Sequence, residues 1–143
     1  MITLSDLIDE VGSDACRYFF LTRSADSQME FDLDLAKKES SENPVFYIQY
    51  AHARIASILK NAQEPAGILE AKYTEPQEYD LIRKMIMLPE VLEQCSVSME
   101  PHHLPHYALD LATSFHAFYH DCHVICEDDP ETTYSRRELI KAA

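Results

Sequence analysis

The stretch NPVFYIQYAHAR, residues 43–54, decides the fold of this chain. Asn43 and Pro44 supply a helix cap and a first-turn residue, and neither Pro nor Gly recurs before Pro65, so the sequence predicts a helix over about 44–62. At roughly 100° per residue, one face of this helix collects side chains that we expect to be buried, with the histidine hydrogen-bonded in the core: Val45, Ile48, His52, Ile55 and Leu59.

The opposite face of the same helix carries two tyrosines and an arginine. Tyr47, Tyr50 and Arg54 lie roughly 145° away from the apolar face, in line with polar Ser57 and Asn61. Flat rings beside a guanidinium suit a single-stranded nucleic-acid loop, whose unstacked bases lie on aromatic faces. Burial against another helix explains the pattern equally well, because aromatic residues at helical spacing are common in cores.

Composition predicts a helical bundle. The 143 residues are 46% hydrophobic, enough to bury a core, and they include only two glycines and seven prolines, most of which separate apolar runs. We therefore expect an all-α fold of one domain, or one domain plus a fragment, in which short turns join the helices.

Charge limits the classes of partner. The net charge of −13 is spread evenly, with −6 over residues 1–44 and −7 over residues 45–143, and no block of Lys or Arg occurs. Binding to nucleic acid without regard to sequence depends on neutralising phosphates, so we expect no DNA partner, and any RNA recognition must be local and geometric.

Four cysteines without a CxxC pair favour reduced core thiols and a cytoplasmic protein: Cys16, Cys95, Cys122 and Cys126. The N-terminus lacks a basic region followed by an apolar run, and no apolar stretch approaches 18 residues. We therefore expect neither export nor a membrane partner.

The remaining elements follow from caps and periodicity. Gly12 fits the C-cap of a first short helix, with Ser5 and Ser13 as N-cap candidates for two helices, and residues 24–42 suggest an extended turn and a short helix. Residues 61–77 suggest a connecting loop, and residues 79–98 are either one helix kinked at Pro89 or two helices.

A second long helix is predicted over about 104–126, and a last one from Thr133 or Ser135. The apolar stripe of the second long helix comprises Leu104, Ala108, Leu111, Phe115, Phe118, Cys122 and Cys126.

Metal and catalytic motifs are weak. His116, His120 and His123 share a helix face at i, i+4 and i+7, but no HExxH element accompanies them, which favours a polar flank able to contact an anion or RNA over a metal site. No glycine-rich phosphate loop or nucleophile elbow occurs, and the acidic clusters at Asp32, Asp34 and 127–129 are typical of solvated charge. We expect no catalytic residue and no metal ligand in this chain.

The run YIQYAHAR at 47–54, together with MITLSDLIDEVGSDACRYFFLTRS at the start and EPHHLPHYALDLATSFHAFYHDCHVI at 100–125, resembles arginyl-tRNA synthetase, a class I aminoacyl-tRNA synthetase. The resemblance covers nearly the whole chain. It implies that residues 1–42 follow the KMSKS-type loop of a catalytic region and that residues 43–143 form the DALR anticodon-binding bundle.

The family implies a division of labour. Its catalytic domain joins arginine to tRNA with ATP and Mg, while its helical bundle holds the anticodon stem and loop of arginine tRNA. By position, the residues implied to contact RNA are Tyr47, Ile48, Tyr50, Arg54, Phe115 and Tyr119. Periodicity supports the two tyrosines of the first helix and Arg54, and it favours Tyr119 over Phe115, which lies on the apolar stripe.

The chain also departs from the family pattern. No HIGH motif occurs, the KMSKS loop would precede Met1, and the last helix of the bundle stops early, so we expect a truncated piece that has no cofactor and is inactive alone. Two alternatives remain open: a helical protein-interaction module, whose interfaces also favour aromatics and Arg, and the DALR domain of another synthetase such as the glycyl enzyme's β subunit.

Overall fold

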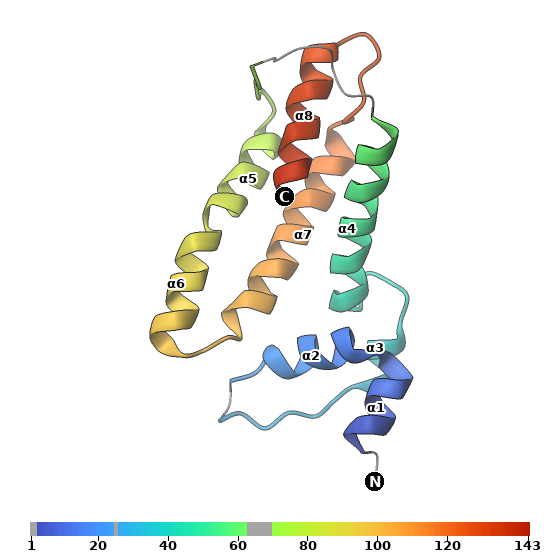
Figure 1. The fold of residues 1–143 in the computed structure, drawn as a ribbon, viewed down its shortest axis with the longest axis vertical. Coiled ribbons are helices and arrows are strands. Elements are labelled where there is room, and N and C mark those ends of the chain that lie inside the picture. The colour runs from blue at the N-terminus through green and yellow to red at the C-terminus, as the bar shows by residue number, and fades with distance from the viewer. Residues whose placement is uncertain (1–2, 25, 63–69) are drawn as a thin grey trace. The chain divides into compact units, whose positions relative to one another are not determined.

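The computed structural model describes residues 3–24, 26–62 and 70–143, and these residues form helices and turns without a strand (Figure 1). The all-α prediction is confirmed. None of the described helices combines the length and apolar character needed to cross a membrane. In chain order the helices are α1 (Leu4–Val11), α2 (Ser13–Leu21), α3 (Leu33–Lys37), α4 (Pro44–Asn61), α5 (Pro76–Ile86), α6 (Leu88–Ser98), α7 (His103–Asp121) and α8 (Pro130–Ala142).

The chain divides into two compact units. One comprises Met1–Gln49 and Pro89–Leu109, and the other comprises Tyr50–Leu88 and Asp110–Ala143. Both α4 and α7 contribute residues to each unit. The domain boundary expected between residues 42 and 43 came from the family resemblance, whereas these two units are defined by compactness. That boundary therefore stays a prediction.

The two short helices at the start of the first unit meet at a glycine, as expected. Gly12 adopts a positive φ of 84°, which residues other than glycine rarely adopt. Its amide donates to the Ile8 carbonyl at the end of α1. The N-cap predictions are wrong. Thr3 caps α1 through a reciprocal pair of hydrogen bonds with Asp6, and α2 begins directly after Gly12 without a side-chain cap, so neither Ser5 nor Ser13 serves.

Asn43 fixes the start of α4. Its side-chain oxygen accepts from the Val45 amide at 3.1 Å, and its side-chain nitrogen donates to the carbonyls of Ala36 and Lys38 at 3.1 and 2.9 Å. Only 4% of Asn43 is exposed. A buried amide that uses both of its ends in this way ties α3 to α4, and the predicted cap and helix are confirmed.

In the second unit, α5 has a capping box between Glu75 and Glu78 and a proline at its first position, Pro76. Met87 interrupts the helical pattern, so residues 76–98 form two helices. Polar contacts align α5 with α7: Gln77 donates to Asp121 at 2.8 Å, and Lys84 lies 3.1 Å from Asp110.

Two helix ends differ from the sequence-based expectation. α7 stops at Asp121 rather than near Cys126, and the turn that follows buries Val124. α8 starts at Pro130, capped by the Asp129 carboxylate, which accepts from the Thr132 amide at 3.0 Å. Asp–Pro at a helix start is the same cap signature as Asn–Pro at α4, so α8 starts before the predicted caps Thr133 and Ser135.

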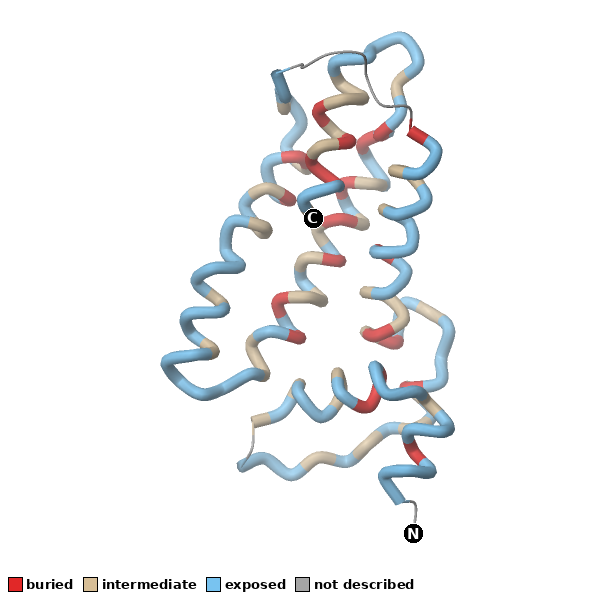
Figure 2. The backbone as a smooth tube through the Cα atoms, viewed as in Figure 1, coloured by how far each residue is buried: buried red, intermediate tan, exposed pale blue. Residues whose placement is uncertain are grey.

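The core of the second unit consists of large side chains that are at most 2% exposed, contributed by α5, α7 and α8: Leu81, Phe115, Phe118, Leu139 and Ile140 (Figure 2). On α4, Val45 is buried as predicted, whereas Ile48, Ile55 and Leu59 are half-buried. The prediction of a core histidine is wrong, since His52 is exposed and the buried face of this helix runs through Ala51 instead.

A buried ion pair joins α5 to α8. Glu78, 2% exposed, accepts at one carboxylate oxygen from Arg136 Nε at 2.7 Å and at the other from the Thr74 and Glu75 amides at 2.8 and 2.9 Å. The guanidinium also donates to the His123 carbonyl at 2.8 Å, just beyond the end of α7. Burial raises the pKa of the Glu78 carboxyl, but these hydrogen bonds outweigh burial, and the pKa lies below its ordinary value.

Arg136→Ala should destabilise the chain far more than the loss of an exposed pair. It leaves the Glu78 carboxylate buried without its cation, which typically costs about 3–5 kcal/mol. Arg83→Ala is the matched control, because the Arg83–Asp80 pair at 2.9 Å is exposed (side chains 73% and 64%) and should contribute at most about 1 kcal/mol. Urea unfolding measures both free energies, and equal losses would contradict the importance of the buried pair.

Glu78→Gln tests the same pair through acid. Because the folded-state pKa of Glu78 is lowered, its stabilisation is present above the ordinary value of 4.5 and is lost as pH falls through the folded-state pKa. The wild type should therefore exceed the variant in unfolding free energy at pH 7, and the difference should shrink below about pH 4.5. A difference that stays constant from pH 7 to pH 3 in urea unfolding would show that the charge of Glu78 is not what stabilises the fold.

Candidate nucleic-acid interface

The middle of α4 carries a buried small side chain between exposed large ones. Ala51 is 5% exposed, whereas Tyr50 keeps 46% of its surface exposed, and Arg54 is exposed as well. Because residues four apart lie above one another on a helix, Tyr50 and Arg54 share one solvent-facing patch. The bundle does not cover these two side chains, which is the orientation that helical periodicity predicted.

Two residues of α7 complete this patch. The guanidinium carbon of Arg54 lies 4.7 Å from the centroid of the Tyr119 ring and 5.9 Å from that of Tyr50. The Tyr50 ring stacks on His116 with a centroid separation of 5.7 Å and an interplanar angle of 18°. We call Tyr50, Arg54, His116 and Tyr119 the aromatic–arginine cluster. It joins two helices far apart in sequence, and all four residues belong to the second compact unit.

The chemistry of the cluster suits a flat, partly anionic ligand. Exposed aromatic faces accept stacked bases, and an arginine that contacts rings through its face keeps N–H donors in its plane for phosphates or base edges. Cation–π attraction holds the guanidinium against the tyrosines before any ligand arrives, which reduces the ordering that binding requires.

Phe115 lies in the core and not on the surface where the family resemblance implied an RNA contact. Only 1% of it is exposed, so its ring is unavailable to stack on a base. The Phe115 ring instead stacks beneath Tyr119 at 6.0 Å with an angle of 24°, and it also contacts His116 at 5.6 Å. Phe115 therefore positions two members of the cluster from within the core, as its place on the apolar stripe suggested.

Tyr47 and Ile48 lie on the part of α4 that belongs to the first compact unit, and both are half-buried. Tyr47 precedes Tyr50 by three residues and shares its side of the helix. Ile48 is about 200° from Tyr50 around the helix axis and lies toward the apolar face. The structure thus groups Tyr50, Arg54 and Tyr119 and leaves Ile48 apart from them.

His116 was grouped in the sequence with His120 and His123, but the three do not form one surface. α7 ends before His123, and the His120 side chain is 88% exposed and lies 2.7 Å from the Asp121 carboxylate. His116 alone joins the cluster. Its spacing of i, i+3 from Tyr119 was a usable signal, but its contact with Tyr50 depends on the register between α4 and α7, which one sequence does not reveal.

Comparison with known proteins places this surface in a family context. The profile of the DALR anticodon binding domain matches residues 48–143, about two thirds of the chain, and includes the whole aromatic–arginine cluster. The chain belongs to the DALR anticodon binding domain family. It is also 54% identical over its entire length to an arginine–tRNA ligase of Dehalococcoides mccartyi.

Solved structures agree with this assignment. The chain superposes on arginyl-tRNA synthetase of Plasmodium falciparum with a TM-score of 0.80 and 26% sequence identity, and the superposition covers 99% of the chain. On arginyl-tRNA synthetase of Thermus thermophilus the TM-score is 0.75 and the identity 26%, over 93% of the chain. It spans about a quarter of these proteins, 25% and 24%, and 26% of the D. mccartyi ligase.

These matches decide between the alternatives left open by the sequence. A family of anticodon-binding domains favours the RNA interpretation over a protein-interaction module. The relatives that match the chain over its full length are arginine–tRNA ligases, which favours the arginyl type of DALR domain over that of another synthetase.

Phe115→Ala and Tyr119→Ala should separate the core from the surface of α7. Emptying the Phe115 site should cost about 3–5 kcal/mol of unfolding free energy, because a buried ring is lost and a cavity remains. Tyr119 is only half-buried and should cost far less, with its contact to Arg54 worth about 0.5–1 kcal/mol. Thermal or urea unfolding measures both, and a larger loss for Tyr119→Ala would reverse the assignment of the two rings.

Proposed function

We propose that this DALR domain recognises the anticodon loop of an arginine tRNA, within a longer arginine–tRNA ligase. Splayed loop bases stack against Tyr50, Tyr119 supports Arg54 and borders the contact, and Arg54 donates hydrogen bonds to a phosphate or a base edge. Stacking of this kind contributes about 1–3 kcal/mol per base and does not require a large positive surface.

The observation that carries the proposal is the exposed Arg54, whose guanidinium carbon lies 5.9 Å and 4.7 Å from the ring centroids of two tyrosines on different helices. Large aromatic side chains are normally covered in a monomeric domain, and an exposed ring beside a cation is typical of binding surfaces. Its position inside the region matched by the anticodon-binding profile supports RNA as the ligand. Tyr47 and Ile48 are proposed to extend the contact along α4, and Phe115 to act indirectly through Tyr119.

The charge of the chain fits this mode of recognition. With a net charge of −13, the domain repels a phosphate backbone at long range, so affinity must come from stacking and a few directed contacts. A loop of unpaired bases offers such contacts, whereas a double helix hides its base faces.

The rest of the proposed protein follows from its relatives, which are arginine–tRNA ligases. We assign the joining of arginine to tRNA, with ATP and Mg, to a catalytic domain elsewhere in the same polypeptide, and we propose that the protein is cytoplasmic. No cofactor is proposed for residues 1–143.

Tyr50→Ala should weaken binding of an arginine-tRNA anticodon stem-loop by about 5- to 150-fold, equivalent to the loss of one stacked base at roughly 1–3 kcal/mol. Tyr79→Ala is the matched control, because Tyr79 is 45% exposed, nearly the same as Tyr50, but lies on α5 outside the cluster. Fluorescence anisotropy of a labelled stem-loop measures both affinities. Equal losses, or none for Tyr50→Ala, would contradict the proposed surface.

Salt dependence separates the role of Arg54 from that of the tyrosine. If Arg54 neutralises one phosphate, Arg54→Ala should reduce the slope of log affinity against log salt by about 0.7, whereas Tyr50→Ala should leave the slope unchanged. Arg54→Lys should restore the slope but not the full affinity, because lysine lacks the planar fork that stacks on tyrosine. A stem-loop with an unrelated loop sequence on the same stem shows whether the loop is what the domain recognises.

A further inference from the structure

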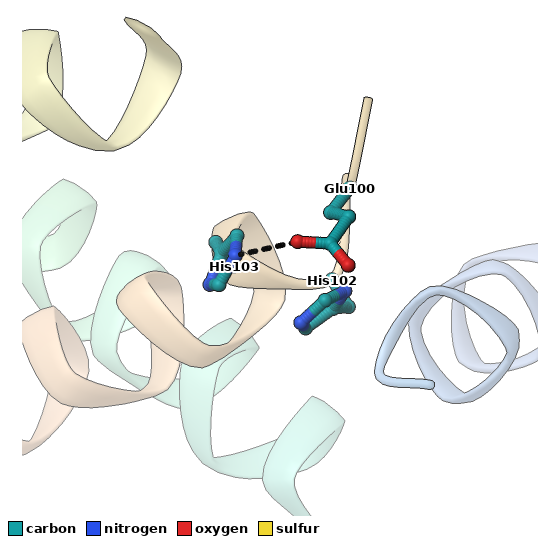
Figure 3. Close-up of side chains that lie close together, drawn as sticks. All are labelled: Glu100, His102 and His103. Carbon is teal, nitrogen blue, oxygen red and sulfur yellow. Dashed lines mark ion pairs between the residues drawn. The ribbon is translucent and has the colours of Figure 1, made fainter. Parts of the chain in front are cut away.

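The turn between α6 and α7 gathers one carboxylate and two imidazoles within five residues, in the sequence EPHHL (Figure 3). One potential ligand atom from each of Glu100, His102 and His103 lies within 4.8 Å of the other two. Glu100 Oε2 is 3.6 Å from His103 Nε2, and the centroids of the two histidine rings are 4.2 Å apart. All three residues belong to the first compact unit, away from the aromatic–arginine cluster's residues in sequence and unit.

The backbone conformation of the turn from α6 to α7 brings these three side chains together. α6 ends at Ser98, and Met99 takes a positive φ of 58°, the only such residue besides Gly12 in the described chain. Pro101 then separates Glu100 from the histidines, and α7 begins at His103. Adjacent residues normally direct their side chains apart, so the near contact of the His102 and His103 rings is a property of this turn.

One nitrogen of the cluster lacks a hydrogen-bond partner. His102 Nδ1 is buried and unpaired, which is unfavourable for a polar atom in the interior. In a neutral imidazole one ring nitrogen carries a lone pair, and a lone pair without a donor nearby is what a metal ligand presents. His103 Nε2 faces the Gln94 side-chain amide at 3.4 Å as well as Glu100.

From this arrangement we propose that Glu100, His102 and His103 bind a zinc ion, which pins the turn from α6 to α7. Two imidazoles and a carboxylate are a common zinc ligand set, with a water at the fourth position. Ligand atoms on a tetrahedral zinc are about 3.3 Å apart, given bonds of about 2.0–2.1 Å. The Glu100 side chain is 49% exposed and can adjust its distance to the two imidazoles.

The sequence did not indicate this site, because the histidine motif that it offered was one of helical spacing. That motif comprises His116, His120 and His123, which share a helix face only if the helix continues to His123, and α7 ends at Asp121. Glu100, His102 and His103 are spaced i, i+2 and i+3 in a turn, a pattern that carries no signal until the backbone conformation is known. The proposal is independent of RNA binding, because it concerns other residues and another compact unit.

Isothermal titration of the 143-residue chain with zinc chloride tests the proposal. We expect one zinc per chain with micromolar affinity, at least tenfold weaker after His102→Ala and after Glu100→Gln. His120→Ala is the matched control, an exposed histidine next to a carboxylate on the same helix as His103, and it should bind as the wild type does. Failure of the wild type to bind zinc, or unchanged binding by both cluster variants, would overturn the site.

A second measurement excludes the thiols. All four cysteines are free, and Cys95 and Cys126 are partly exposed, so they are the competing zinc ligands in this chain. Cobalt(II) in place of zinc should show the visible bands of a nitrogen and oxygen site without the intense near-ultraviolet band of thiolate ligation, and Cys95→Ser and Cys126→Ser should bind as tightly as the wild type. A thiolate band, or loss of zinc in either serine variant, would assign the metal to cysteine and refute the proposal.

Discussion

The second compact unit depends on the burial of a single carboxylate. Glu78 cannot remain charged in the interior unless its carboxylate is paired and hydrogen-bonded, and it has three donors: the Arg136 guanidinium and the amides of Thr74 and Glu75. These partners come from α8 and from the residues that precede α5. Arg136 also donates from Nη1 to the carbonyl of His123. One charge therefore fixes the start of α5, the position of α8 and the end of α7.

The position of α7 decides the surface that α4 presents. α7 sends Phe115 and Phe118 inward, and the residues one position further along, His116 and Tyr119, flank the tyrosine and arginine of α4. Phe115 lies beneath both flanking rings, so the exposed cluster rests on the same core that the ion pair stabilises. Damage to that core should affect the proposed RNA binding indirectly, which is why the matched surface control on α5 is needed to interpret any loss.

The sequence predicted those features that are local to one helix. Asn43–Pro44 placed the start of α4, and helical pitch placed Tyr50 and Arg54 on its open side. It failed where tertiary contacts decide. His52 lies at the edge of an apolar face whose buried line runs through Ala51, and α7 ends at Asp121 because the following turn buries Val124 and engages Arg136. The start of α8 was predicted at Thr133 or Ser135, although the Asp129–Pro130 pair carries the cap signature of the actual start. The partnership of Tyr50 with His116 required the packing of two helices.

The geometry of Arg54 bears on the apparent conflict between an acidic chain and the proposed RNA ligand. Its guanidinium carbon lies 4.7 Å and 5.9 Å from the ring centroids of two tyrosines, and a guanidinium that stacks on a ring through its face keeps its N–H donors free in its own plane. Ring contact and hydrogen bonding therefore do not compete for the same atoms. A cation held in place by neutral rings offers directed donors without a surrounding positive field, so it discriminates by shape at short range while the negative surface disfavours indiscriminate phosphate binding. An acidic domain with one fixed arginine is in this sense better suited to selecting a particular loop than a basic one.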